Sequence, residues 1–133
     1  MRYILILTLF VTLSWAQNLE AFAKKYHYET DYKVALQKAK AQKKEIFFVM
    51  ATNYCPWCRK YEKRTLSSLA VDKAIHKDYI PLILNRQKGD FPDRFQTPIV
   101  PVTYFVDYKD GSIVAKEVGF KAKKELLELL NIR

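Results

Sequence analysis

The sequence predicts an α/β fold in which a mixed sheet of four or five strands has helices on both faces. Residues 46–51 are apolar at every position, which is typical of a strand that is covered on both faces. Helix-like segments with one apolar face precede and follow this run. Near the end of the chain, two strand-like segments flank a turn at 108–111, which predicts an antiparallel hairpin.

The segment before the apolar run is predicted as a helix that packs one face against the sheet. Asp31 is the expected N-cap, because an Asp side chain accepts hydrogen bonds from the free N–H groups of a first helical turn. The helix should end among lysines near Lys43, where positive charge complements the helix dipole. Farther upstream, residues 26–28 are a candidate for a short added strand. The apolar face of the predicted helix comprises Tyr32, Ala35, Leu36 and Ala39.

The segments after the apolar run continue the α/β pattern. A helix is predicted over 59–66, a second helical piece over 69–77 and a strand over 79–85. Pro81 has no N–H to donate to a strand ladder, so this strand is expected at an edge of the sheet. The face of the first helix that should pack on the sheet comprises Cys58, Tyr61, Glu62, Thr65 and Leu66.

The remaining segments are a loop, a hairpin and a closing helix. The loop covers residues 86–98 and includes a candidate helical turn at 92–95. The hairpin strands are expected at 102–107 and 112–118, on either side of the turn. The apolar stripe of the closing helix comprises Ala122, Leu126, Leu129 and Leu130.

The first sixteen residues have the pattern of a cleaved secretory signal. Arg2 precedes an apolar stretch over 3–13, and Ser14-Trp15-Ala16 follows with small side chains at its outer positions. The stretch is too short to span a bilayer, which takes about 20 residues. The prediction is a signal peptide at 1–16 and one domain at 17–133, in a protein exported to the periplasm. Retention of the segment as an uncleaved anchor is the alternative.

The composition and net charge of the chain limit the kinds of partner that we expect it to bind. The chain of 133 residues carries a formal net charge of +9, which becomes +8 once residues 1–16 and their Arg2 are removed. A lysine surplus can attract acidic partners or anionic lipid, but a solvated basic surface is the simpler explanation. The sequence holds no nucleic-acid-binding motif, internal repeat or low-complexity tract. We therefore expect no nucleic acid among the partners.

Cys55 and Cys58 are the only cysteines, and they stand directly after the apolar strand at the start of a helix. Two thiols at this spacing can form a disulfide within one turn and can also act as a reactive dithiol. The loop that they close is very short, so a disulfide here would be a poor structural staple. Redox chemistry is therefore predicted, with a static disulfide and a metal pair as alternatives. His27 and His76 lie far from the pair in sequence and do not compose a zinc site with it.

Three short motifs, placed in this order of elements, resemble the thioredoxin superfamily. They are Tyr54-Cys55-Pro56-Trp57-Cys58, Val100-Pro101 before a strand, and Val118-Gly119 before the last helix. Within the superfamily, the stretches 59–63 and 71–74 look most like exported thioredoxin-like proteins and the C-terminal thioredoxin domain of the periplasmic disulfide interchange reductases. The resemblance covers roughly residues 34–130. One departure is Val49, which stands where cytosolic thioredoxins carry a buried Asp.

The resemblance implies a thioredoxin-like fold for the domain at 17–133 and a division of labour between the cysteines. Cys55 would be the nucleophile, because a helix start stabilises a thiolate, and Cys58 the resolving thiol. Pro56 fits the first helical turn, where a missing N–H costs nothing. Trp57 is expected as an exposed wall beside Cys55, with inward packing as its alternative.

The resemblance also singles out the segment before the hairpin. Pro101 resembles the family's cis-proline, which lies against the cysteine pair. It would leave the backbone of Val100 free to pair with an extended substrate. Pro98 is the competing candidate for the cis-proline.

Glu62 is a further candidate because it falls one helical turn after Cys58 on the same face. A carboxylate there can accept or relay the proton that the resolving thiol loses, the task that Val49 leaves vacant. We expect burial to raise its pKa. The alternative is a glutamate that is simply paired with Arg59 or Lys63.

The sequence thus predicts an exported thiol-disulfide oxidoreductase that exchanges its Cys55–Cys58 dithiol or disulfide with protein thiols or disulfides. We expect it to act as a reductant or isomerase rather than as a general oxidant, and to need no metal and no cofactor beyond this dithiol. The expected partners are protein substrates and a redox partner in the membrane or periplasm. The alternatives are a redox-inert thioredoxin-like binding or chaperone module and a copper metallochaperone that uses the cysteine pair.

Overall fold

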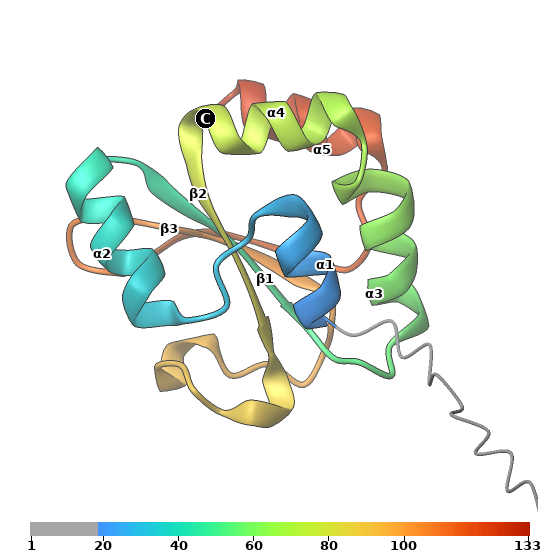
Figure 1. Cartoon of the computed structure of the whole chain (residues 1–133), viewed down its shortest axis with the longest axis horizontal. Helices are drawn as coiled ribbons and strands as arrows, with labels where there is room; N and C mark the ends of the chain where they lie inside the picture. Colours follow the sequence, from blue (N-terminus) through green and yellow to red (C-terminus); the bar gives the residue numbers. More distant parts are fainter. Residues whose placement is uncertain (1–18) are drawn as a thin grey trace, which may run out of the picture.

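A four-stranded sheet lies at the centre of the computed structural model, which describes residues 19–133 (Figure 1). Its strand order is β2-β1-β3-β4, with β1 parallel to β2 and antiparallel to β3, and with β3 and β4 antiparallel. The predicted mixed sheet is confirmed, and the predicted signal peptide at 1–16 lies outside the described residues. In chain order the elements are α1 (Leu19–Tyr26), α2 (Tyr32–Gln42), β1 (Glu45–Ala51), α3 (Pro56–Tyr61), the π-helix η1 (Glu62–Leu66), α4 (Leu69–Asp78), β2 (Tyr79–Asn85), the 3-10 helices η2 (Arg86–Lys88) and η3 (Asp93–Phe95), β3 (Val102–Val106), β4 (Ile113–Val118) and α5 (Lys123–Asn131).

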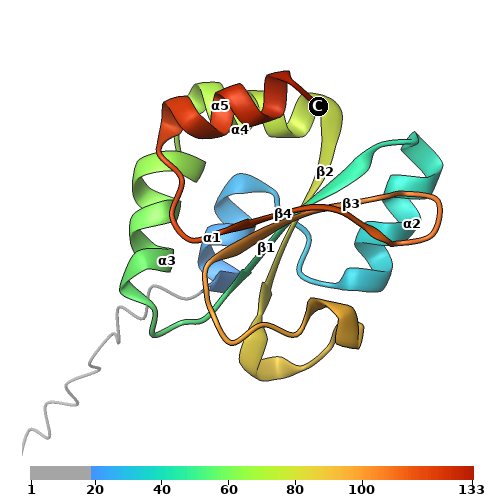
Figure 2. The same ribbon diagram turned by 180° about the vertical axis from the view of Figure 1, so that it is seen from behind.

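Strand β1 is the central strand, as its apolar sequence predicts, and it supplies side chains to a core on each face of the sheet. Phe47 and Val49 belong to the core that α1, α3, α4 and α5 cover. Phe48 and Met50 belong to the other core, which α2 covers. Figure 2 shows from behind that α4 and α5 lie side by side. Because β1 is held on both faces, the residues at its carboxyl end have a fixed position.

The helices on either side of β1 begin where their sequences predict. Asp31 caps α2, since its side chain accepts a hydrogen bond from the Val34 N–H at 3.0 Å. The predicted helix over 59–66 is present, but it changes from α-helix to π-helix at Glu62. The residues predicted for its inner face are all buried, namely Cys58, Tyr61, Glu62, Thr65 and Leu66.

Helix α1 occupies a stretch in which the only predicted element is the short strand at 26–28. It ends at Tyr26, because His27 adopts a left-handed backbone with a φ of 58°. The predicted strand at 26–28 is therefore wrong. The residue that pairs with the sheet is Glu29, whose N–H donates to the Pro81 carbonyl at 2.8 Å. A helical apolar spacing could have revealed α1, at Leu19, Phe22, Ala23 and Tyr26.

Strand β2 lies at the edge of the four-stranded sheet, as Pro81 predicts. The hairpin of β3 and β4 also forms as predicted. The predicted stripe of α5 needs one correction, because Ala122 is the exposed N-cap of this helix rather than part of its apolar face. Leu126 and Leu130 are the residues of α5 that are buried against the rest of the domain.

A buried hydrogen bond joins Tyr61, the last residue of α3, to strand β3. The hydroxyls of Tyr61 and Thr103 lie 2.9 Å apart, and both residues are 0% exposed. We expect Tyr61→Phe to lower the free energy of unfolding by about 1 to 3 kcal/mol, because it leaves the Thr103 hydroxyl buried without this partner. Urea unfolding of Tyr61→Phe, Thr103→Val and the double variant checks this. The double variant should lose less than the sum of the two single losses, and simple additivity would contradict the pairing.

Candidate active site

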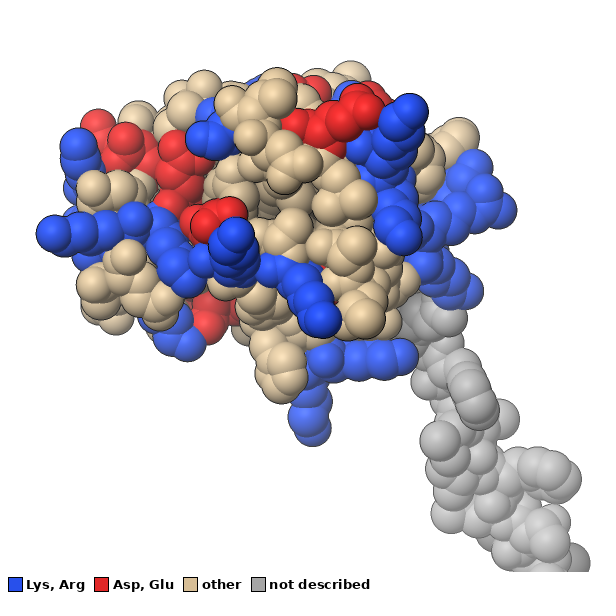
Figure 3. Space-filling view, turned by 90° about the horizontal axis from the view of Figure 1, so that it is seen from above, with Lys and Arg blue, Asp and Glu red and all other residues tan. Residues whose placement is uncertain are grey.

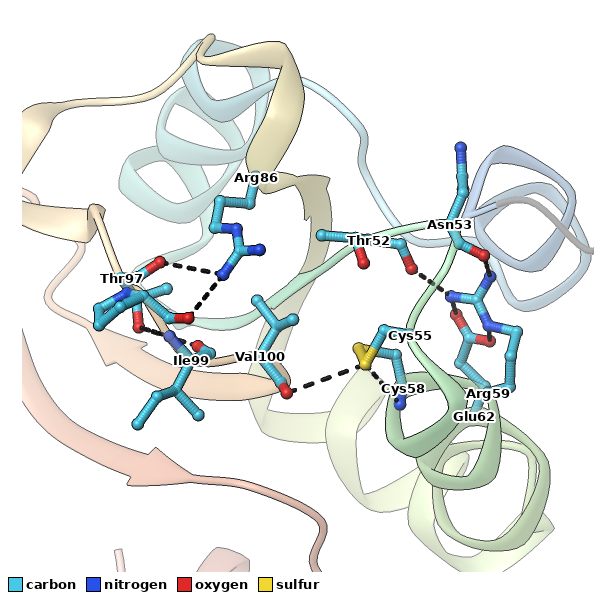
Figure 4. Close-up of a disulfide and its surroundings, with 11 residues drawn as sticks. Thr52, Asn53, Cys55, Cys58, Arg59, Glu62, Arg86, Thr97, Ile99 and Val100 are labelled. Carbon is cyan, nitrogen blue, oxygen red and sulfur yellow. Dashed lines mark hydrogen bonds and ion pairs between the residues drawn. A yellow bond between two sulfur atoms is a disulfide. The ribbon is translucent and has the colours of Figure 1, made fainter.

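Cys55 and Cys58 form a disulfide at the start of α3, just beyond the carboxyl end of β1 (Figure 4). Cys55 is the N-cap of α3, and its Sγ accepts a hydrogen bond from the Cys58 N–H at 3.1 Å. Pro56 is the first residue of the helix, where its missing N–H costs nothing. Cys55 is partly exposed whereas Cys58 is 1% exposed. Of the two sulfurs, that of Cys55 is therefore the one within reach of a substrate.

The segment before β3 lies against the disulfide. The Val100 carbonyl oxygen is 3.8 Å from Cys55 Sγ, and the Val100–Pro101 peptide bond is cis. Within residues 19–133 no other peptide bond is cis, so Pro98, the competing candidate, is trans. The Val100 N–H has no hydrogen-bond partner in this described part of the chain. The structure thus brings an available backbone donor and acceptor to the side of Cys55, the predicted nucleophile.

Three exposed apolar side chains lie next to the cysteines or to Val100 in the chain. Tyr54 is 88% exposed, Trp57 is 55% exposed and Ile99 is 54% exposed. Trp57 is exposed rather than packed inward, with the Lys60 ammonium 4.4 Å from its ring centroid and the Phe120 ring 6.0 Å away, and its part as a wall beside Cys55 stays a prediction. Tyr54 and Ile99 were not among the predicted site residues, although each adjoins one of them in sequence. Exposed apolar side chains this close in sequence to the cysteine pair and to Val100 favour contact with a polypeptide.

Glu62 is buried, with 7% of its surface exposed, and its carboxylate is held by Arg59. Glu62 Oε2 lies 2.7 Å from Arg59 Nε, and Oε1 accepts a hydrogen bond from Arg59 Nη2 at 2.9 Å. The same guanidinium donates to the carbonyls of Thr52 and Asn53, at 3.1 and 3.4 Å (Figure 4). The Arg59–Glu62 pair therefore ties α3 to the segment that leads from β1 to Cys55. The predicted alternative, an ion pair with Arg59, is what the structure contains.

Burial raises the pKa of Glu62 to about 7, although the Arg59 guanidinium acts in the opposite direction. The predicted rise in pKa is thus in the direction expected from burial on the inner helix face. The Glu62 N–H donates to the Cys58 carbonyl within the helix, but no hydrogen bond in residues 19–133 joins the Glu62 carboxylate to Cys58 Sγ, because the carboxylate is turned to Arg59. A part for Glu62 in the proton transfer of Cys58 stays a prediction. The spacing of three residues between Arg59 and Glu62 was the signal for their pairing.

The described residues contain neither a metal-binding cluster nor a membrane-spanning helix. Residues 19–133 hold no cluster of three His, Cys, Asp or Glu side chains that could share a metal ion. No helix in this range is both long and apolar enough to cross a membrane.

Comparison with known proteins agrees with this architecture. The family model described as a thioredoxin-like domain matches residues 32–132. A thioredoxin from Thermus thermophilus is similar in structure, with a TM-score of 0.65, 22% identity and coverage of 77% of this chain and 83% of that one. A disulphide isomerase from Xylella fastidiosa Temecula1 has a TM-score of 0.60 and 17% identity, over 92% of this chain and 97% of its own. The oxidised DsbD C-terminal domain from Neisseria meningitidis has a TM-score of 0.57 and 19% identity, over 78% and 98%.

At these identities the structural neighbours show the fold. No curated protein matches the chain by sequence. The family model covers most of the chain, and the disulfide lies at the start of a helix directly after the central strand. The chain therefore belongs to the thioredoxin-like domain family, and its Cys55–Cys58 pair makes it a thiol-disulfide oxidoreductase of that fold.

Proposed function

We propose that the protein is exported and exchanges disulfides with polypeptide substrates, as a reductant or isomerase. The observation that carries the proposal is the asymmetry of the sulfurs. Cys55 is partly exposed beside the free backbone groups of Val100, while Cys58 is buried one turn into the helix. The disulphide isomerase from Xylella fastidiosa Temecula1 shares the fold and supports activity as an isomerase.

In the reductive direction, the Cys55 thiolate attacks one sulfur of a substrate disulfide. A mixed disulfide forms, and the other substrate sulfur leaves as a thiolate that takes up a proton. Cys58 then loses its proton and attacks Cys55 Sγ, which closes the Cys55–Cys58 bond and releases the second substrate thiol. The substrate has gained two electrons and the protein has become the disulfide, and a protein dithiol must restore it. In isomerisation, a second substrate thiol attacks the mixed disulfide and no net electrons are transferred.

Export and the redox partner rest on the amino-terminal pattern rather than on the domain. The signal-like sequence of residues 1–16 would direct the chain to the periplasm, where a partner in the membrane or periplasm restores the dithiol. Figure 3 shows lysine and arginine side chains spread over the face that carries α4 and α5, with acidic side chains among them. This mixture favours a solvated basic surface over a dedicated site for an anionic partner.

Turnover of insulin disulfides with a dithiol reductant tests the proposal. Catalysed reduction supports an oxidoreductase acting on polypeptides, and its absence would leave a redox-inert binding module. A redox titration against glutathione then places the pair among reductants or oxidants.

The asymmetry of the sulfurs also predicts their reactivity. In the reduced protein, iodoacetamide should modify Cys55 much faster than Cys58, because Cys55 is partly exposed and accepts the N–H bond of the helix start. Mass spectrometry of timed samples measures both rates. Equal rates would contradict the assignment of nucleophile and resolving thiol.

A further inference from the structure

The backbone that faces Cys55 belongs to a segment that is tied to the sheet only at its end, where the Pro101 carbonyl accepts a hydrogen bond from the Gly119 N–H at 2.8 Å, directly after β4. Residues 96–101 form neither helix nor strand, and β3 begins only at Val102. Pro98 and Pro101 have no N–H, which leaves the segment few hydrogen bonds of its own. Yet the Val100 carbonyl lies 3.8 Å from Cys55 Sγ. The Val100 side chain packs against both cores of the domain, and the backbone of residues 97–99 is held from outside the segment.

Arg86 supplies that support from the end of β2. It is the first residue of η2, directly after Asn85, so its backbone is anchored to the sheet. Its Nη1 donates to the Pro98 carbonyl at 2.9 Å and to the Thr97 carbonyl at 3.3 Å (Figure 4). A charged donor makes stronger hydrogen bonds than a neutral one. One side chain thus links the sheet to two consecutive carbonyls of the segment.

Thr97 carries this support on toward Val100. Thr97 is 6% exposed, and its Oγ1 accepts a hydrogen bond from the Ile99 N–H at 3.2 Å and donates to the Ile99 carbonyl at 2.8 Å. These bonds fix the backbone on one side of Val100, and Pro101 restricts it on the other. The Val100 N–H and carbonyl are then held in place before a substrate arrives.

We propose that Arg86 is a positioning residue for polypeptide substrates, which acts by holding the 97–100 backbone at the distance from Cys55 where an extended substrate chain can pair with Val100. The inference rests on the proposed function and adds a determinant of its substrate class. It requires a substrate with a peptide backbone beside the reacting sulfur. A small disulfide without peptide groups gains nothing from the arrangement.

Two substrates separate this role from a general effect on the fold. For Arg86→Met we expect kcat/KM to fall about tenfold with insulin, mostly through KM, because the backbone of the site is no longer held in register. With hydroxyethyl disulfide, which has no peptide groups, kcat/KM should stay unchanged. Arg86→Lys keeps the charge on a side chain without the guanidinium fork and should recover part of the loss.

Arg94 offers a matched control in the same loop. Its Nη1 also donates to a backbone carbonyl, that of Gly111 at 2.7 Å, but this bond leads to the turn between β3 and β4. Arg94→Met should leave both substrates unaffected. Thr97→Val keeps the side-chain volume and removes the bonds to Ile99, so it should show the same selective loss as Arg86→Met. If Arg86→Met does not fold, Thr97→Val still tests whether a fixed 97–100 backbone is needed for polypeptide substrates.

Equal losses with both substrates, or no loss with insulin, would overturn the role of Arg86 and leave the proposed oxidoreductase activity standing. A parent protein that reduces neither disulfide would overturn the proposed function, and this inference with it.

Discussion

A Cys58→Ser variant is expected to accumulate as a mixed disulfide with its substrates. The Cys55 sulfur keeps its exposure and its place at the start of α3, so attack on a substrate disulfide can still occur. The step that releases the substrate needs the second thiol and is lost. Catalysed turnover should fall to the uncatalysed rate, and gels run without reductant should show the protein shifted to higher mass. Mass spectrometry then identifies Cys55 as the linked residue.

The Cys55→Ser variant is the matched control, because it also leaves one thiol. Its remaining sulfur, that of Cys58, is 1% exposed and should capture far fewer partners. Capture of the same set by both variants would mean that Cys58 is as accessible as Cys55, contrary to the burial seen here. The captured proteins would also reveal the natural substrates.

Glu62→Gln is expected to remove a pH dependence from the stability of the fold. Burial raises the pKa of Glu62 to about 7 in the folded protein, from an ordinary value of 4.5. Between these two pH values the folded protein binds a proton that the unfolded chain has already lost. The free energy of unfolding of the parent therefore falls as the pH rises through this window, and the loss is complete above about pH 7. The amide of the Glu62→Gln variant cannot ionise, so the variant lacks this contribution.

The size of this effect depends on how much more tightly Glu62 binds its proton in the folded protein than in the unfolded chain. A tenfold difference in affinity is worth about 1.4 kcal/mol. Allowing for partial contact with solvent, we expect the parent to lose on the order of 2 kcal/mol relative to Glu62→Gln between about pH 5 and about pH 8. Urea unfolding at a series of pH values measures it. Glu125→Gln is the control, because Glu125 is exposed and pairs with Lys121 at 3.4 Å; it should follow the parent.

The same variant tests a role in the exchange reaction. If Glu62 takes part in deprotonating Cys58, the pH profile of turnover should change near pH 7. If the pH profile of turnover of Glu62→Gln overlays that of the parent while the stability is altered, the role of Glu62 is structural, as the partner of Arg59. If Glu62→Gln and the parent showed the same pH dependence of the free energy of unfolding, a raised pKa of Glu62 in the folded protein would be contradicted.

The parts of the fold that local sequence determines could be predicted. β1 was evident because every position is apolar from Ile46 onward, and the cysteine pair drew attention through its place between a strand and a helix. Helix α1 was missed although its apolar spacing is regular, because the aromatic residues of the segment also suit a strand. The change to π-helix at Glu62 has no local signature in the chain.

The rest depends on residues that meet only in the folded chain. Arg86 and Pro98 are joined across the loop between β2 and β3, and Tyr61 meets Thr103 from another element. Neither pair follows a helical or strand period, so spacing could not reveal it. The protonation of Glu62 is a balance between burial and Arg59, and only the packed structure supplies both.

The positions of Leu19 and Arg133 determine which end of the domain is suited to attachment to a bead, a dye or an electrode. The Leu19 N–H at the start of α1 donates to Asn53 Oδ1 at 3.0 Å, in the segment that leads to Cys55. Arg133 lies instead near the starts of β1 and β2, with its guanidinium 4.4 Å from the Phe105 ring centroid. A bead, dye or electrode joined ahead of Leu19 would crowd the disulfide. One joined after Arg133 would present it outward, the length of β1 away.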